Sequence, residues 1–327
     1  MAITISGGVQ LTGPVVLTQS SGGGGGGSYS FQGSNYGYTT GGGTTSTNAI
    51  NVIQKFPFTS DSDTTDVGDL TRNTRMGAGQ SSSTSGYLSG GAGSFPSPND
   101  NSRTNIIEKF AFSSDGSATD VGDITTIRQG GSGQSSSSHG YTSGGVQPSS
   151  AGNVIDKFPF SSDGNATDVG DITQENAYTS GQSSSDNGYV SGGQPPSGVT
   201  NVIDKFSFSS DSNATDIGDL VELIRDTSGQ SSTTSGYISG GYSGIGAVSS
   251  VNFIQKFSFS SDSNASDVAD LLSNIQRSSG QSSISSGYVS GGNLNDVIQK
   301  FPFASDSNAT DVGNLLAGNQ YSAGQQY

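Results

Sequence analysis

Dense runs of side-chain oxygens recur along this sequence and are its most chemically capable feature. One run contains Asp211, Asn213, Asp216 and Asp219. Oxygen ligands at such short spacing can hold Ca²⁺. The spacing differs from that of an EF-hand loop and no Glu closes it, and Asp and Asn also favour tight turns because their side chains bond nearby backbone. We therefore expect turns and no cofactor, with Ca²⁺ binding at the Asp-rich turns as the alternative.

Groups suited to nucleophilic or metal catalysis are scarce. The chain has no cysteine, which excludes disulfides, thiolate metal sites and thiol nucleophiles. His139 is the only histidine, so a multi-histidine metal centre cannot form within one chain. Near-identical copies of its segment carry Ser85, Asn187, Ser235 or Ser286 in its place, so we expect a surface residue. No Gly-x-Ser-x-Gly elbow in a strand–turn–helix setting is visible, and the sequence favours a protein that is not an enzyme.

The lysines share one motif. Every lysine opens a Lys-Phe-x-Phe motif, and the six are Lys55, Lys109, Lys157, Lys205, Lys256 and Lys300. They could form a ring that binds polyanions. The excess of acids favours the other interpretation, in which each lysine pairs with an acid on its own or a neighbouring repeat, although surface pairs add little stability.

The net charge of −15 excludes several classes of partner. A strongly acidic surface repels phosphate backbones, so we expect no nucleic-acid partner. No stretch approaches the roughly 18 continuous apolar residues of a membrane span, so we expect no membrane insertion. The first residues lack the basic region and apolar stretch of a secretory signal, which predicts synthesis in the cytoplasm and release by another route.

One repeated unit covers almost the whole chain. A Gly-Tyr-x-[Ser/Thr]-Gly-Gly element accompanies each Lys-Phe-x-Phe motif, with its tyrosine at Tyr38, Tyr87, Tyr141, Tyr189, Tyr237 and Tyr288. The period of about 50 residues fits a four-stranded blade of a β-propeller, and kelch repeats have about that length. We therefore predict an all-β fold: a six-bladed kelch-like β-propeller over residues 29–327, with four strands per blade and an N-terminal β anchor segment.

Four strands, a to d, are expected in each unit, here at 181–185, 188–193, 154–160 and 167–172. In strand c, Val154 and Phe158 share one face while Ile155 and Lys157 share the other. Apolar groups on both faces are typical of a blade packed between two neighbours. Proline cannot donate to a strand ladder, so the prolines within strand c predict a bulge or bend there; they are Pro57, Pro159 and Pro302.

The segments that vary between copies are the d–a and b–c connections, which emerge on one face of a propeller. Arg75, Arg128, Arg225 and Arg277 all lie in d–a segments. Loops on rigid scaffolds often carry function, so these arginines are the candidate binding residues of that face. The alternative is that the segments vary because nothing contacts them.

The two ends of the chain predict how the ring closes and how it is attached. The final Ala323-Gly324-Gln325 matches Ala78-Gly79-Gln80, the start of a strand a. We therefore expect the C-terminal tail to supply strand a to the first blade; the alternative is that residues 29–34 form that strand.

The N-terminal residues 1–21 alternate apolar side chains as strands do, and a flexible glycine-rich tether, 22–28, follows them. Since so short a segment cannot bury its own apolar face, we interpret it as an anchor that adds to another subunit's sheet; a disordered tail is the alternative. The anchor residues are Ile3, Ile5, Val9, Leu11, Val15 and Leu17.

The double glycine after an apolar–aromatic strand, followed by strand c and an acidic turn, resembles the kelch motif. The repeat also contains Asp-Lys-Phe-Pro-Phe, Ala-Thr-Asp-Val-Gly-Asp, Gly-Gln-Ser-Ser-Ser and Gly-Tyr-x-Ser-Gly-Gly. With these motifs, the repeat resembles those of kelch-like proteins of marine and cyanobacterial tailed phages. The resemblance spans residues 29–327 and implies a virion protein.

These observations predict a virion structural protein, as a fibre, decoration or tail-associated component. Residues 1–21 would contact other virion proteins while the propeller projects. The alternative is an adhesin module that binds a host receptor or a host-surface glycan. Assembly into a homo-oligomer is compatible with either role.

Overall fold

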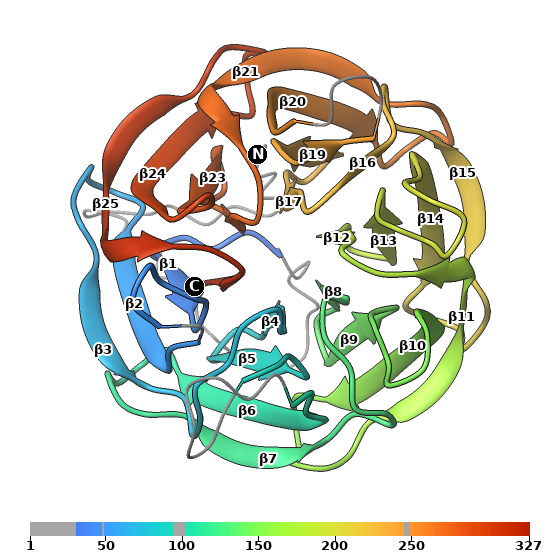
Figure 1. The fold of residues 1–327 in the computed structure, drawn as a ribbon, viewed down its shortest axis with the longest axis horizontal. Helices are drawn as coiled ribbons and strands as arrows, with labels where there is room; N and C mark the ends of the chain where they lie inside the picture. Colours follow the sequence, from blue (N-terminus) through green and yellow to red (C-terminus); the bar gives the residue numbers. More distant parts are fainter. Residues whose placement is uncertain (1–30, 48, 94–101, 245–248) are drawn as a thin grey trace, which may run out of the picture.

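The computed structural model describes residues 31–47, 49–93, 102–244 and 249–327. The predicted anchor strands (1–21) and tether (22–28) lie outside these residues. The described part is all β: it contains no helix, and therefore none that could span a membrane. Six four-stranded antiparallel sheets are arranged around a central axis as a closed ring (Figure 1), which confirms the predicted six-bladed propeller.

Each blade follows the predicted order, with strand a at the axis and strand d outside. The first blade contains β26 (Ala323–Gln326), β1 (Tyr36–Thr40), β2 (Val52–Pro57) and β3 (Thr65–Asp69). The second contains β4 (Ala78–Ser81), β5 (Ser85–Ser89), β6 (Ile106–Ala111) and β7 (Thr119–Asp123). The third contains β8 (Ser132–Ser135), β9 (His139–Ser143), β10 (Gly152–Pro159) and β11 (Thr167–Asn176).

The other three blades repeat this pattern. The fourth contains β12 (Ser180–Ser183), β13 (Asn187–Ser191), β14 (Val202–Ser207) and β15 (Thr215–Asp219). The fifth contains β17 (Ser228–Ser231), β18 (Ser235–Ser239), β20 (Val251–Ser258) and β21 (Ser266–Ile275). The sixth contains β22 (Ser279–Ser282), β23 (Ser286–Ser290), β24 (Asn295–Pro302) and β25 (Thr310–Asn319). A small two-stranded sheet, β16 (Ile224–Arg225) and β19 (Tyr242–Ser243), joins a d–a loop to a b–c loop.

The C-terminal strand closes the ring, as predicted. β26 pairs with β1 from Gly37↔Gln326 to Thr40↔Ala323. Residues 31–34 do not take this place: the Gly33 N–H donates to the Ser282 carbonyl of the sixth blade at 2.9 Å.

The hydrophobic core lies between blades rather than inside them. Tyr38 of the first blade packs on Phe110 and Phe112 of the second, with ring centroids 5.4 and 4.9 Å apart. Aromatic pairs of this kind contribute about 0.5–1.5 kcal/mol beyond their buried area. The same trio recurs at every interface, as Tyr87–Phe158–Phe160, Tyr141–Phe206–Phe208, Tyr189–Phe257–Phe259, Tyr237–Phe301–Phe303 and Tyr288–Phe56–Phe58.

The Gly-Gln pair of each strand a forms the inner wall. Gln80 Nε2 donates to the Tyr141 carbonyl of the next blade at 2.9 Å. The glycines permit this close approach of neighbouring strands a, since a Cβ on Gly133 of the next blade would lie 2.1 Å from the Gly79 carbonyl oxygen. The other five glutamines make the same bond around the ring; they are Gln134, Gln182, Gln230, Gln281 and Gln325.

The strand c prolines are accommodated differently from the prediction. A bulge does exist in β2, but it lies between Ile53 and Gln54, not at Pro57. The Phe58 N–H donates to Asn35 of the β1 side, so strand alternation turns the nitrogen of Pro57 toward strand d. The ladder to strand d has already ended at Lys55↔Thr65. Proline is therefore tolerated because it stands just beyond that ladder.

Candidate ligand-binding site

The lysines and the Asp runs hold adjacent blades together. Lys157 Nζ lies 2.8 Å from Asp211 of the next blade, and the same pairing is found at every interface, which confirms the expected pairing. The run supplies turn and interface bonds as well: the Asp171 N–H donates to Asn213 Oδ1 at 3.1 Å, and the Gly218 N–H donates to Asp216 Oδ1 at 3.1 Å. Among the residues that the structure describes, no three His, Cys, Asp or Glu side chains converge as a metal site.

Three carboxylates are buried in strand c, and each meets a threonine of the preceding blade. Asp204 accepts hydrogen bonds from both the N–H and the hydroxyl of Thr173, at 3.1 and 2.7 Å. Glu108 and Thr71 form the same contact, as do Asp156 and Thr125. Burial raises the pKa of Asp204 and of Glu108, while these hydrogen bonds oppose the rise.

At the other three interfaces, both the threonine and the strand c carboxylate are replaced by other residues. The residue in place of threonine is aliphatic and can donate only its N–H, and strand c then carries a neutral glutamine. The pairs are Val221–Gln255, Leu272–Gln299 and Leu316–Gln54. Because carboxylates appear only where a second donor exists, these acids have a structural role between blades.

Arg128 is not a surface residue, contrary to its selection as a candidate of the variable face. Its guanidinium lies 2.6 Å from Asp156 Oδ2 and donates to the Thr142 carbonyl at 3.0 Å. Its side chain is 1 % exposed, so it cannot reach a ligand on that face. The sequence concealed this because the partner carboxylate stands on the next blade.

A closed ring of backbone hydrogen bonds surrounds the axis where the d–a loops enter strand a. The N–H of Asp226 donates to the carbonyl of Tyr178 at 3.0 Å, and the N–H of Arg277 donates to Asp226 at 2.9 Å. The circle continues through Tyr321, Met76 and Gly130 and returns to Tyr178. We call these six positions the axial ring.

All six axial-ring residues have positive φ, between 55° and 68°. Glycine adopts this region freely, but only Gly130 is glycine; a non-glycine residue in a sparsely populated region costs about 1–3 kcal/mol. The ring therefore holds five side chains over the axis at an energetic cost. Such outliers are common at ligand sites.

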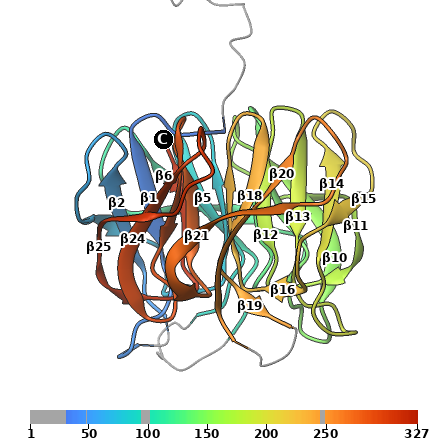
Figure 2. The same ribbon diagram turned by 90° about the horizontal axis from the view of Figure 1, so that it is seen from above.

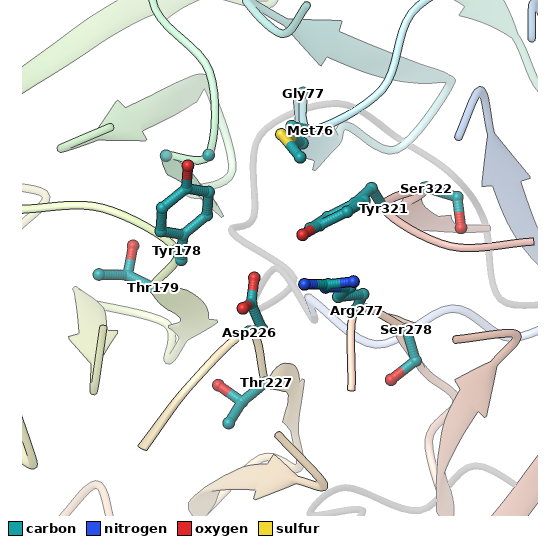
Figure 3. Close-up of a pocket in the computed structure, with 12 residues that line it drawn as sticks. Met76, Gly77, Tyr178, Thr179, Asp226, Thr227, Arg277, Ser278, Tyr321 and Ser322 are labelled. Atoms are coloured by element: carbon teal, nitrogen blue, oxygen red, sulfur yellow. The ribbon is translucent and has the colours of Figure 1, made fainter. Parts of the chain in front are cut away.

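The axial ring opens into a cavity of about 70 Å³ on the d–a face. Figure 3 shows Asp226, Arg277 and Tyr321 pointing toward one another from three successive loops, with Tyr178 on the other side of Asp226. Thr179 and Thr227, which follow the ring positions, also line the cavity.

The charges of this axial pocket are unevenly matched. Arg225 lies 2.6 Å from Asp226 and neutralises it. Burial raises the pKa of Asp226, and Arg225 and Arg277 oppose that rise. Arg277 stacks over Tyr321 at 4.9 Å. Burial, with a contribution from Asp226, raises the pKa of Tyr321 to about 12, so its phenol is neutral at physiological pH.

Three of the four predicted arginines thus lie in or near the axial pocket. Arg277 lines the pocket, Arg225 pairs with Asp226, and the guanidinium of Arg75 lies 6.0 Å from the ring of Tyr321. The sequence analysis missed Tyr178, Asp226 and Tyr321. Their common signal was position: each stands three residues before the Gly-Gln pair of strand a, where the copies differ.

The N-terminal side of the described chain lies at the opposite mouth of the axis. Phe31 lines the central channel and a second cavity beside Ser82 and Ser83, in an a–b turn. Gln32 Nε2 donates to the Ser231 carbonyl across the channel at 2.8 Å. Figure 2 shows β16 and β19, of the d–a face, at the end of the ring opposite the C-terminus. The chain therefore enters the ring at one mouth, and the axial pocket opens at the other.

Comparison with known proteins supports the fold. No known protein family and no curated protein matches the sequence. A solved structure titled "Structure of YjhT" is similar with a TM-score of 0.66 and 12 % identity, over 86 % of this chain and 98 % of that chain. At this identity the likeness concerns the fold alone.

Proposed function

We propose that this chain is a virion structural protein, a fibre, decoration or tail-associated component. Residues 1–21 attach it to other virion proteins, and the propeller projects from them. The observation that supports this proposal is the polarity of the axis. Phe31 lies at the a–b mouth, so a chain attached through its N-terminus directs the variable d–a face away from the attachment.

The propeller is suited to this role because the same stabilising contacts are repeated at every interface between blades. Tyrosine–phenylalanine contacts, glutamine bonds and lysine–aspartate pairs repeat at each interface between blades. Pairing of β26 with β1 completes the first blade and closes the ring. A rigid, closed module of this kind can be carried on a particle without other domains to stabilise it.

The proposed role does not include catalysis. The buried acids Glu108, Asp156 and Asp204 are each bound by a threonine of the adjacent blade. The carboxylate in the axial pocket, Asp226, is bound by Arg225. These contacts hold acids that could otherwise exchange protons with a substrate.

The test is removal of residues 1–27 from the full chain. We expect a folded propeller with an unchanged melting temperature that no longer joins the particle. Thermal melting and quantification of the protein in purified particles measure the two effects. Normal incorporation of the truncated chain would contradict the proposal, and loss of folding would assign the segment to the propeller instead.

A second candidate function is an adhesin module that binds a host receptor or surface glycan. The axial pocket favours it, because it places an acid, an arginine and two tyrosines at the exposed end of the axis. Binding of purified propeller to host cells, with and without substitution of axial-ring residues, tests this role. Equal binding by all variants would count against it.

A further inference from the structure

The axial ring is the place where the repeat loses its symmetry. The inner glutamines, the strand c lysines and the core tyrosines are the same in all six blades. The axial ring instead holds Met76, Gly130, Tyr178, Asp226, Arg277 and Tyr321. An ion on the axis or a symmetric partner would favour the same residue type at all six positions of the axial ring. Unequal residues are suited to a small asymmetric ligand held by a few placed polar groups.

Several hydrogen-bond donors of the pocket are buried without a partner in the described part of the chain. They are the Arg277 Nε–H and the hydroxyls of Thr179 and Thr227. Thr179 is 9 % exposed and Thr227 is 8 % exposed, and both line the same cavity as Arg277. Because unpaired buried polar groups are costly, a ligand that accepts hydrogen bonds would be favoured there.

The pocket also carries unmatched positive charge. Asp226 forms its ion pair with Arg225 at 2.6 Å, while Arg277 faces the cavity and contacts Tyr321 through its cation–π stacking. All six arginines of the chain lie in d–a or b–c segments, while all six lysines lie in strand c. Although the net charge of the chain is −15, Arg277 therefore gives this pocket a local positive charge that can attract a single anionic group.

The size of the pocket limits what can enter. The cavity is about 70 Å³, and a cavity needs roughly 10–15 Å³ of such space to hold one water. The space therefore accommodates a small polar group such as a carboxylate. The rest of a ligand would lie over the mouth, where the rings of Tyr178 and Tyr321 offer apolar surface.

We propose that the axial pocket binds a carboxylated sugar: Arg277 and the two threonine hydroxyls hold the carboxylate, and the tyrosines flank the sugar ring. This inference rests on the adhesin role proposed above for the d–a face. The ligand class is thus an acidic glycan with isolated carboxylates.

A sugar fits these observations better than an acidic peptide does. A peptide rich in Asp or Glu brings many charges toward a chain whose own net charge is −15, and like charges repel over the length of such a polymer. One carboxylate in the pocket avoids most of this repulsion.

The test measures binding to the full chain by isothermal titration calorimetry. The probes are D-galacturonate, D-glucuronate and D-mannuronate, their neutral counterparts, and hexaglutamate. We expect at least one uronate to bind about tenfold or more tightly than its neutral counterpart, because hydrogen bonds to charged groups are the stronger ones. Arg277→Gln should abolish this preference, and Thr227→Val should weaken uronate binding without lowering the melting temperature.

Arg103→Gln is the matched control, because it removes an arginine from a b–c segment that does not line the pocket, and it should bind as the wild type does. Equal affinity for uronates and neutral sugars, stronger binding of hexaglutamate, uronate binding that survives Arg277→Gln, or no uronate binding would each overturn the inference. Incorporation of Arg277→Gln into particles should be normal, so the structural role is tested separately.

Discussion

The guanidinium of Arg128 lies 2.6 Å from the carboxylate of Asp156 across the interface between the second and third blades, with both side chains at most 1 % exposed. Arg128 follows strand d of the second blade, and Asp156 stands in strand c of the third. The pair therefore lies in the buried core of this interface and is not a surface ion pair. It makes this interface sensitive to the loss of either charge.

Arg128→Ile alone should destabilise the protein by about 3–5 kcal/mol, because it removes the counter-ion of a buried carboxylate and leaves Asp156 with only the hydrogen bonds from Thr125. The equivalent positions of later blades carry Ile224 with Gln255, and Ile275 with Gln299. The triple variant Thr125→Val, Arg128→Ile, Asp156→Gln imports the set found at the fourth-to-fifth interface and should recover most of the loss. Denaturant unfolding measures both variants. A triple variant as unstable as the single one would contradict the equivalence of the interfaces.

Stability should depend on pH through Asp204. Burial raises the pKa of Asp204 in the folded chain above the ordinary 3.8. At pH values between the unfolded pKa and this raised folded pKa, the folded chain therefore binds more protons than the unfolded chain. Its contribution to the free energy of unfolding is therefore greatest below the unfolded pKa and falls as pH rises through the folded pKa. Asp204→Asn removes this titration.

The measurement is the stability of wild type relative to Asp204→Asn, followed by denaturant unfolding from about pH 4 to about pH 7. This relative stability should decrease as pH rises. An increase over the same range would show that the carboxylate is stabilised in its charged form.

Gly133→Ala should destabilise the ring by about 2–3 kcal/mol or more, as overpacking against backbone does. The added Cβ would lie 2.1 Å from the Gly79 carbonyl oxygen. Gly164→Ala is the matched control, since a Cβ there meets no atom within 4 Å. Thermal melting compares them, and equal melting temperatures would show that strand a can shift.

Deletion of residues 324–327 should lower the melting temperature by several degrees or prevent folding. The deletion removes nearly all of β26 and with it the bond from Gln325 Nε2 to the Tyr87 carbonyl at 3.0 Å. Tyr327→Ala is the control, because it removes a ring stacked on Phe112 and keeps the strand. A deletion variant that melts like the control would refute closure by the C-terminal strand.

Addition of Ca²⁺ or EDTA should leave the melting temperature unchanged. In the Asp runs, Asp163 already pairs with Lys109 at 2.9 Å, and Asn165 accepts the Asp123 N–H at 3.1 Å. Scanning fluorimetry with either addition tests this expectation. A rise of several degrees with Ca²⁺ would instead indicate a site, since a ligand that binds only the folded chain stabilises it.

Part of the molecule could be predicted because its signals are local and repeated. The Gly-Tyr and Lys-Phe-x-Phe elements located strands b and c, and the likeness of residues 323–325 to 78–80 predicted closure by β26. The bulge was misplaced at Pro57, because the end of the ladder between strands c and d is a property of the pairing and not of the proline.

By itself, the sequence determined the blade, its number of copies and the closing strand, since the same spacing of glycine, aromatic and lysine residues recurs six times. Only the tertiary structure decided which residues form the axial pocket. Tyr178, Asp226 and Arg277 are about 50 residues apart, one period of such a repeat, and lie in the segments that differ most between copies. Closure of the ring brings them to one mouth of the axis, and the backbone bonds between successive loops turn their side chains toward it.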